Sequence, residues 1–162
     1  MPSKPLELIR EIEWAYLAGM IDGEGSITIT EHRRADRPGY MRRNLRVQIY
    51  GTDPRLMVWL QSHFGGRTYS TREHQENRKA QLSIVWAESQ IEPILLGALP
   101  YLVIKAEQAE IALAYQSLKL PASAGRRKGH SEQALKTMEN LWSRLRVLNK
   151  RGKSAVENSE AG

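Results

Sequence analysis

The 162-residue chain contains no cysteine and no long uninterrupted apolar run. The absence of cysteine excludes disulfide bonds and thiolate-ligated metal sites. Proline, glycine or charge interrupts every apolar stretch, so none reaches the ~20 residues that a membrane-spanning helix needs. Residues 1–13 become acidic soon after their start and lack the apolar stretch of a signal peptide. We therefore expect an intracellular protein without a membrane partner, and the sequence does not distinguish cytoplasm from organelle.

Acidic residues are the minority among the charged ones, with 18 Asp+Glu against 24 Lys+Arg and a net charge of +6. The positive excess is clustered in residues 33–46, 126–128 and 144–153. A cationic surface favours a polyanionic partner, and nucleic acid is the commonest one. Charge alone leaves open the alternative of a surface that is basic only for solubility.

The hydrophobic content of 41% is ordinary for a globular protein, and the length suits one domain with a real core. We predict a single domain in residues 1–150 and a polar, disordered tail in residues 151–162. Helical spacing of apolar residues predicts a helix over residues 5–21 that ends in a glycine-rich turn at 23–25. Alternating patterns predict strands at 26–30, 44–50, 67–72 and 80–86.

Capping signals place further helices. Asp53 and Pro54 begin a helix that ends at Gly65, and Ser89 and Glu92 have capping-box spacing, which predicts a helix to about residue 99. Helices are also expected over residues 104–120 and, capped by Ser131, to about residue 149, the last of them for packing. The order predicts an α+β fold of the form αββαββα with additional C-terminal helices.

The first predicted helix ends in the string LAGMIDGEG, residues 17–25. Ala15, Ala18 and Gly19 remove bulk from one helix face, which lets two helix backbones approach closely. No other segment repeats this pattern, so the partner helix would come from a second copy of the chain, related by a two-fold axis.

Asp22 and Glu24 lie at the C-terminal end of this helix, where the helix dipole disfavours carboxylates. A dimer would bring two such pairs together, and divalent cations would relieve the repulsion. Gly23 and Gly25 permit a tight turn and expose carbonyl oxygen to a cation. On these residues alone, the alternative is that Asp-Gly is only a turn between helix and strand.

The whole nine-residue string resembles the motif of the LAGLIDADG homing endonucleases, with Met20 for Leu and Gly23-Glu24 for Ala-Asp. The following Ser-Ile-Thr-Ile is similar to the family's first DNA-facing strand, and residues 100–105 (PYLVIK) resemble the segment in which the family often has a basic residue near the active site. The resemblance covers residues 11–149, and one motif in a short chain resembles the homodimeric branch. It implies an intron-encoded enzyme that cuts a long pseudo-palindromic DNA site by metal-dependent phosphodiester hydrolysis and leaves 3′ overhangs.

The resemblance also implies roles for the motif residues. Glu24 corresponds to the essential metal-binding acid, and Gly23 would offer its backbone carbonyl. Asp22 corresponds to the acid that holds the turn and the helix pair, so it joins Ala15, Ala18 and Gly19 at the dimer interface. The expected ion is Mg²⁺, with Mn²⁺ or Ca²⁺ able to occupy the site, and no small-molecule cofactor is expected.

Outside the motif, Lys105 resembles the family's active-site lysine, and the alternative is a surface lysine at the end of an element. Arg55 resembles a basic residue that orders the water network, and the alternative is a surface charge. Some family members have Gln before the second helix where this chain has Gly51. Gln48 or Thr52 could take that role, and the sequence leaves the choice open.

Polar residues that alternate with the predicted core positions, together with nearby basic residues, form the expected surface for double-stranded DNA. For any single one of them, an ordinary solvated position is the alternative. The residues are Ser26, Thr28, Thr30, Arg33, Arg34, Arg37, Tyr40, Arg42, Arg43, Asn44, Arg46, Gln48, Arg67, Tyr69, Arg72, Gln81 and Ser83.

Three other functions compete with an endonuclease. A DNA-binding regulator of the same fold would not need Glu24 and Lys105. An intron maturase that assists RNA splicing could keep the motif, and the sequence does not exclude that added activity. A basic structural protein would have no reason to keep the intact motif.

Overall fold

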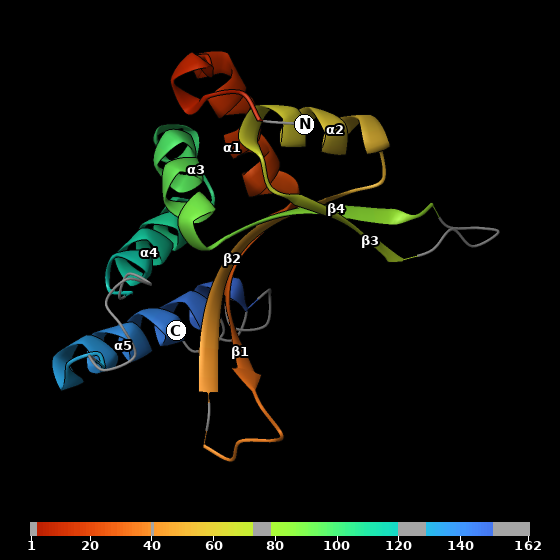
Figure 1. The fold of residues 1–162 in the computed structure, drawn as a ribbon. Helices are drawn as coiled ribbons and strands as arrows, with labels where there is room; N and C mark the ends of the chain where they lie inside the picture. The colour runs from red at the N-terminus through yellow and green to blue at the C-terminus, as the bar shows by residue number, and fades with distance from the viewer. Residues whose placement is uncertain (1–2, 40, 73–78, 120–128, 151–162) are drawn as a thin grey trace, which may run out of the picture.

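The computed structural model describes residues 3–39, 41–72, 79–119 and 129–150. Figure 1 shows the order of the elements. They are the 3-10 helix η1 (Leu6–Leu8), α1 (Glu11–Glu24), β1 (Gly25–Arg33), β2 (Met41–Gly51), α2 (Pro54–Phe64), β3 (Arg67–Arg72), β4 (Gln81–Ala87), η2 (Glu88–Gln90), α3 (Ile91–Ala98), η3 (Leu99–Tyr101), α4 (Ala106–Ser117) and α5 (Glu132–Asn149). The predicted α+β order is confirmed. Tyr40 and the tail at 151–162 lie outside the described residues.

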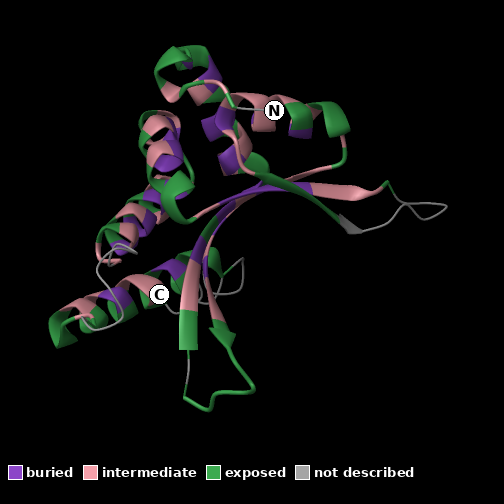
Figure 2. Cartoon of the chain, viewed as in Figure 1, coloured by how far each residue is buried: buried purple, intermediate pink, exposed green. Residues whose placement is uncertain are grey.

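The strands form one antiparallel sheet in the order β1-β2-β4-β3. The predicted alternation along β2 is confirmed, because Leu45, Val47 and Ile49 are all buried. All five α-helices contribute buried side chains to the core on this face of the sheet. Figure 2 shows the buried residues concentrated where helices meet the sheet, while the β1–β2 hairpin extends beyond them. Residues on the opposite face of the sheet, such as Thr28 and Arg46, are half-buried or exposed.

The first helix differs from its predicted bounds at both ends, since α1 begins at Glu11 and ends at Glu24. Its N-terminal end is fixed by Glu13, which is buried and accepts hydrogen bonds from the Arg10 backbone N–H (2.8 Å) and Lys4 Nζ (2.9 Å). The Arg10 N–H and the Lys4 ammonium hold the pKa of Glu13 at about 2. These contacts attach the segment before α1 to the helix itself.

The turn expected at residues 23–25 is wrong, because Gly23 lies inside α1 and β1 begins at Gly25 with no loop between them. A side chain at Gly25 would place its Cβ 2.6 Å from both Cα and the carbonyl oxygen of Ile21. Only glycine lets the strand leave the helix at so short a distance.

Two predicted helix starts are confirmed by their caps. The Asp53 side chain accepts a hydrogen bond from the Arg55 N–H with Pro54 in the first turn of α2. The Ser131 side chain accepts one from the Ala134 N–H at the start of α5. Local cap chemistry therefore determines where these helices begin.

The capping box predicted from Ser89 and Glu92 is wrong. Ser89 belongs to the 3-10 helix η2, and α3 begins at Ile91 after Gln90, whose side chain makes no capping hydrogen bond. The next helix is also shorter than its predicted range of 104–120, because α4 spans Ala106–Ser117. The residues before it form η3 and an irregular segment that reaches back to α1.

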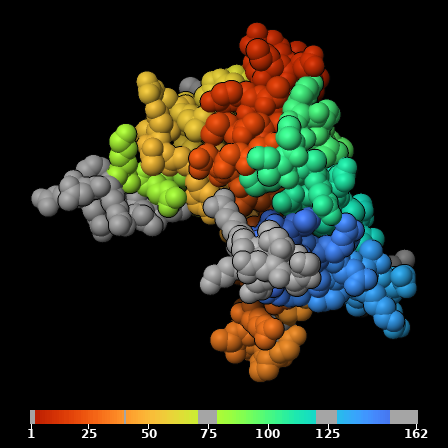
Figure 3. Space-filling view, turned by 180° about the vertical axis from the view of Figure 1, so that it is seen from behind, coloured from red at the N-terminus to blue at the C-terminus, as the bar shows by residue number. Residues whose placement is uncertain are grey.

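Helix α5 covers the free edge of β1. Trp142 Nε1 donates to the Ile29 carbonyl (3.3 Å) and Asn149 Nδ2 donates to the Ile27 carbonyl (2.8 Å). This helix was predicted to serve packing, and its residue Met138 is buried in the core. Seen from behind in Figure 3, α5 lies against α4, above the projecting β1–β2 hairpin. Among the described helices, none combines the length and hydrophobicity that crossing a membrane would take.

Candidate active site and nucleic-acid interface

The C-terminal end of α1 is fixed to the segment that precedes α4. The two carboxylate oxygens of Asp22 accept hydrogen bonds from the N–H groups of Val103 (2.8 Å) and Lys105 (2.9 Å). Lys105 Nζ in turn donates to the carbonyl oxygens of Ile21 (2.9 Å) and Asp22. An ammonium group thus lies at the negative end of the helix dipole, where it is most stabilising. The structure brings Lys105 to the motif, which lies about 80 positions earlier in the chain.

Glu24 is the last residue of α1, and its side chain is exposed. Because Gly25 pairs with Ile49, Glu24 lies where β1 enters the sheet beside the end of β2. Gln48 lies opposite Ser26, while Thr52 follows the last residue of β2. Glu24, Gln48 and Thr52, which were predicted to be site residues, therefore all lie near the same end of the sheet.

Arg55 lies in the first turn of α2, just beyond Thr52, and its guanidinium is exposed. It is paired with Asp53, with 2.6 Å between Arg55 Nη2 and Asp53 Oδ2. Hydrogen bonds from the Arg55 side chain and backbone hold the pKa of Asp53 at about 2. Arg55 thus pairs with the N-cap residue of its own helix, and its hydrogen bonds and ion pair within the described residues do not include Glu24.

The oxygen donors at this end of α1 suit a hard cation. Glu24 offers a carboxylate and Gly23 offers a backbone carbonyl. Among the described residues, no group of three or more His, Cys, Asp and Glu side chains gathers to hold a metal ion. Mg²⁺ commonly keeps several waters and binds through one or two carboxylates together with substrate phosphates. The donor set therefore fits an open site, which waters and further oxygen ligands would complete, and it does not fit a closed cage among the described residues.

The open face of the sheet bears rows of polar side chains that run across the strands. On β1 and β2, the register places Ser26 opposite Gln48, Thr28 opposite Arg46 and Thr30 opposite Asn44. All six residues alternate with buried core positions, as predicted from sequence. The rows form a nearly continuous hydrogen-bonding surface.

The rows continue across β4 to β3. Gln48 lies opposite Val85, and Val85 lies opposite Arg67. Ser83 lies between Tyr50 and Tyr69 in the next row. Arg72 lies opposite Gln81 beyond a β-bulge, so the predicted residues of β3 and β4 are paired with one another.

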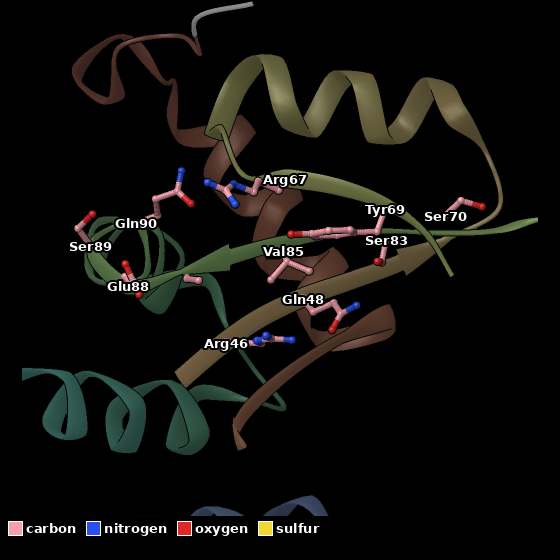
Figure 4. Close-up of a pocket in the computed structure, with 11 residues that line it drawn as sticks. Arg46, Gln48, Arg67, Tyr69, Ser70, Ser83, Val85, Glu88, Ser89 and Gln90 are labelled. Atoms are coloured by element: carbon pink, nitrogen blue, oxygen red, sulfur yellow. The ribbon is translucent and has the colours of Figure 1, made fainter. Parts of the chain in front are cut away.

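A hollow of about 910 Å³ lies on this open face. Figure 4 shows Arg46 and Gln48 from β2 and Arg67 and Tyr69 from β3 gathered around it. The floor includes Val85, which is 9% exposed. Guanidinium and amide groups around an apolar floor can bind the polar edges of nucleobases and the thymine methyl group.

The prediction that Arg43 belongs to the DNA-binding surface is wrong. Arg43 alternates with Asn44 and therefore points to the covered side of the sheet, where its guanidinium pairs with Glu31 (2.9 Å) and Glu139 (2.6 Å). It also lies 4.0 Å from the ring centroid of Trp142. Its charge is used to attach α5 to the sheet and is not available on the open face.

The other predicted arginines of the hairpin are exposed. Arg34 pairs with Asp36 (2.9 Å) and Arg42 pairs with Glu88 (3.3 Å), both between exposed groups. Arg33 lies 3.8 Å from Glu31, and Arg37 lies in the loop between β1 and β2. Exposed pairs of this kind are weak, so the guanidinium groups can exchange partners.

Tyr50 and Val85 lie on the open face of the sheet, and the sequence did not lead us to predict them there. Val85 lies within an apolar run, which favours a core assignment. The alternation of Gln81, Ser83 and Val85 with Leu82 and Ile84 was the signal that could have placed it on the open face. Ser83 was predicted there, and its hydroxyl is buried without a hydrogen-bond partner among the described residues.

The exposed face of α1 differs from the face of small residues that was predicted to form the dimer interface. Ala18 is fully buried in the core of its own chain, so it is not available to a partner. The exposed face contains Ala15 and Gly19, together with Ile12 and Tyr16, which are 70% and 50% exposed. A Cβ at Gly19 would meet no atom within 4 Å. The face therefore combines an open backbone with large exposed apolar groups.

No protein-family model and no curated protein sequence matches the chain. Solved structures do match. The homing endonuclease I-CvuI, in complex with its target in the presence of calcium, has 20% sequence identity and a TM-score of 0.65, covering 89% of this chain and 85% of that one. The archaeal intron-encoded homing endonuclease I-Vdi141I, complexed with DNA, has 18% identity and a TM-score of 0.67, with 88% and 87% covered.

A third match is the LAGLIDADG homing endonuclease I-SmaMI bound to cleaved DNA, with 17% identity and a TM-score of 0.62. It covers 93% of this chain but 47% of the I-SmaMI chain. At such identities the likeness concerns the fold, and it agrees with the α1–β1 motif, the sheet order and the helices described above. This chain therefore has the fold of the LAGLIDADG homing endonucleases.

Proposed function

We propose that this chain is a site-specific double-strand DNA endonuclease that acts as a homodimer on a long, pseudo-palindromic target and leaves 3′ overhangs. The observation that supports it most directly is the position of Glu24. This exposed acid ends α1 where the open polar face of the sheet begins, with Lys105 bonded to the same helix end. The solved structures of the neighbours I-CvuI and I-Vdi141I, which share the fold, are complexes with DNA.

The homodimer is supported by the exposed face of α1. Ile12, Ala15, Tyr16 and Gly19 would pack against their copies in a second chain, because an open backbone lets two helices approach closely. The match to 47% of the I-SmaMI chain also supports it, since that chain has room for two such units. A two-fold dimer requires a DNA target with matching approximate symmetry.

In this proposal Glu24 and the Gly23 carbonyl hold Mg²⁺, a site that Mn²⁺ or Ca²⁺ can also occupy. The bound ion supplies charge stabilisation for a phosphodiester displacement. Lys105 places a positive charge beside the phosphate while it holds the last turn of α1. Arg55, with Gln48 or Thr52, orders the water that attacks phosphorus.

The open face supplies sequence recognition. A guanidinium such as that of Arg46 can bind the O6 and N7 atoms of guanine, and the amide of Gln48 can bind the N6 and N7 atoms of adenine. The exposed arginines of the β1–β2 hairpin would contact phosphates, which gives affinity without sequence preference.

The test is cleavage of a plasmid that contains the uninterrupted insertion junction of the chain's own intron, with and without magnesium. Glu24→Gln should lower the cleavage rate by more than about 100-fold while DNA binding persists, because a neutral amide is a poor ligand for a hard cation. Glu110→Gln, an exposed acid on α4, is the matched control and should cut at the wild-type rate. A Glu24→Gln variant that cuts as fast as wild type would contradict the proposal.

The same assay separates the competing functions. A wild-type protein that binds the junction equally with and without magnesium and never cuts it would be a DNA-binding regulator. Added splicing of the precursor RNA would reveal a maturase activity alongside the nuclease.

A further inference from the structure

A second hollow, of about 310 Å³, lies between β1 and the C-terminal half of α5. Its β1 side includes Thr28 and Thr30, which the register places on the open face of the sheet. Its α5 side ends in the cations Arg146 and Lys150. The hollow therefore extends the open face past the edge strand and onto a helix.

Trp142 positions Arg146 at this edge. The indole is fixed by its hydrogen bond to the Ile29 carbonyl, and the Arg146 guanidinium lies 4.7 Å from the ring centroid. Stacking on a ring leaves the N–H groups of a guanidinium free for an acceptor. The contact restricts the arginine to the edge of β1 without consuming its donors.

Among the described residues, the two cations differ from their neighbours on α5 in having no acidic partner. Arg144 pairs with Glu107 (3.0 Å) and Lys136 pairs with Glu132 (3.0 Å). Within the described part of the chain, no carboxylate lies within ion-pair distance of Arg146 or Lys150. Positive charge without an acidic partner, at the rim of a hollow that also exposes two threonines of β1, suits an anionic ligand.

The width of the sheet, compared with that of the DNA major groove, indicates which anion Arg146 and Lys150 would meet. The four strands are ~4.8 Å apart, so β1 and β3 are separated by roughly 14 Å. The major groove of DNA is ~12 Å wide. A sheet that enters the groove with its strands along it must therefore meet the sugar–phosphate backbones at its outer edges.

We propose that Arg146 and Lys150 of α5, with the Thr28 hydroxyl beside them, bind backbone phosphates where the edge of β1 meets the wall of the DNA groove. The inference rests on the proposed function only in taking DNA as the ligand. It assigns a DNA contact to a helix that otherwise packs against the sheet, and the contact is independent of base sequence.

The test is the salt dependence of binding to a fluorescently labelled duplex of unrelated sequence, measured by anisotropy in EDTA. The double variant Arg146→Ala/Lys150→Ala should lower the slope of log K against log salt by about 1.8, since each phosphate contact contributes ~0.9. Arg144→Ala/Lys136→Ala is the matched control, because it removes the same charge from the same helix and should leave the slope near that of wild type.

Further variants exclude an effect of misfolding. Arg146→Lys should keep most of the slope, and Lys150→Gln, which removes no contact with Trp142, should lower it by about 0.9. An equal change in both double variants would mean that only net charge matters and would overturn the inference. A wild-type protein that binds no duplex would contradict the proposed function as well, whereas normal binding with an unchanged slope in Arg146→Ala/Lys150→Ala would overturn this inference alone.

Discussion

Gly25 lies at the point where α1 passes directly into β1. Replacing it with alanine would place a Cβ 2.6 Å from the Ile21 backbone, so helix or strand must shift. We expect Gly25→Ala to lower the free energy of unfolding by about 1–3 kcal/mol, the usual cost of overpacking. The contrasting variant is Gly23→Ala, where a Cβ meets nothing within 4 Å and a helical alanine should add roughly 0.5–1 kcal/mol.

Urea denaturation of the two variants measures the difference. Shifts of opposite sign would support the close passage from helix to strand. If both glycines tolerate alanine equally, the direct junction between α1 and β1 does not depend on Gly25.

The two acids of the motif have different surroundings although only one residue separates them. Asp22 accepts two backbone N–H groups and holds the segment before α4. Glu24 is exposed at the sheet. One carboxylate is thus used in structure, and the other remains free for the proposed metal chemistry.

At the scale of elements, the main unpredicted contact is the cover that α5 gives to the edge of β1. Asn149→Ala would remove the donor to the Ile27 carbonyl, and we expect a loss of about 1 kcal/mol in the free energy of unfolding. Asn140→Ala, an exposed asparagine on the same helix, should change stability little. Thermal and urea unfolding of both variants provide the comparison, and equal stabilities would show that the Asn149 contact contributes nothing.

At the scale of the whole molecule, the prediction concerns assembly through α1. In the proposed homodimer, Gly19→Leu should hold the two α1 helices apart, convert the dimer to a monomer and abolish double-strand cutting, because the proposed active sites would be completed across the two-fold axis. Light scattering on the free protein measures the first effect and cleavage of the junction plasmid measures the second.

The control for assembly is Ser143→Leu, which adds the same side chain at an exposed position of α5. It should remain dimeric. A Gly19→Leu monomer that still cuts both strands without dimerising on DNA would contradict the assembly proposed through α1.

The sequence by itself determined the features that depend on neighbouring residues. Asp53 and Ser131 begin helices because a side-chain cap acts within three residues, and Leu45, Val47 and Ile49 alternate because successive side chains of a strand point to opposite faces. It failed at Ser89, because cap spacing alone does not decide whether the backbone there forms an α-helix or a 3-10 helix.

The tertiary structure decided the features that depend on distant residues. Lys105 reaches the motif through contacts with Ile21 and Asp22, and Arg43 pairs with Glu139 of α5 on the covered side of the sheet, away from its open face. The burial of Ala18 is likewise a property of the helices and strands packed around it. Local pattern determines which side of an element a residue lies on, but only the packing of elements determines what that side meets, because the partners are brought together from far along the chain.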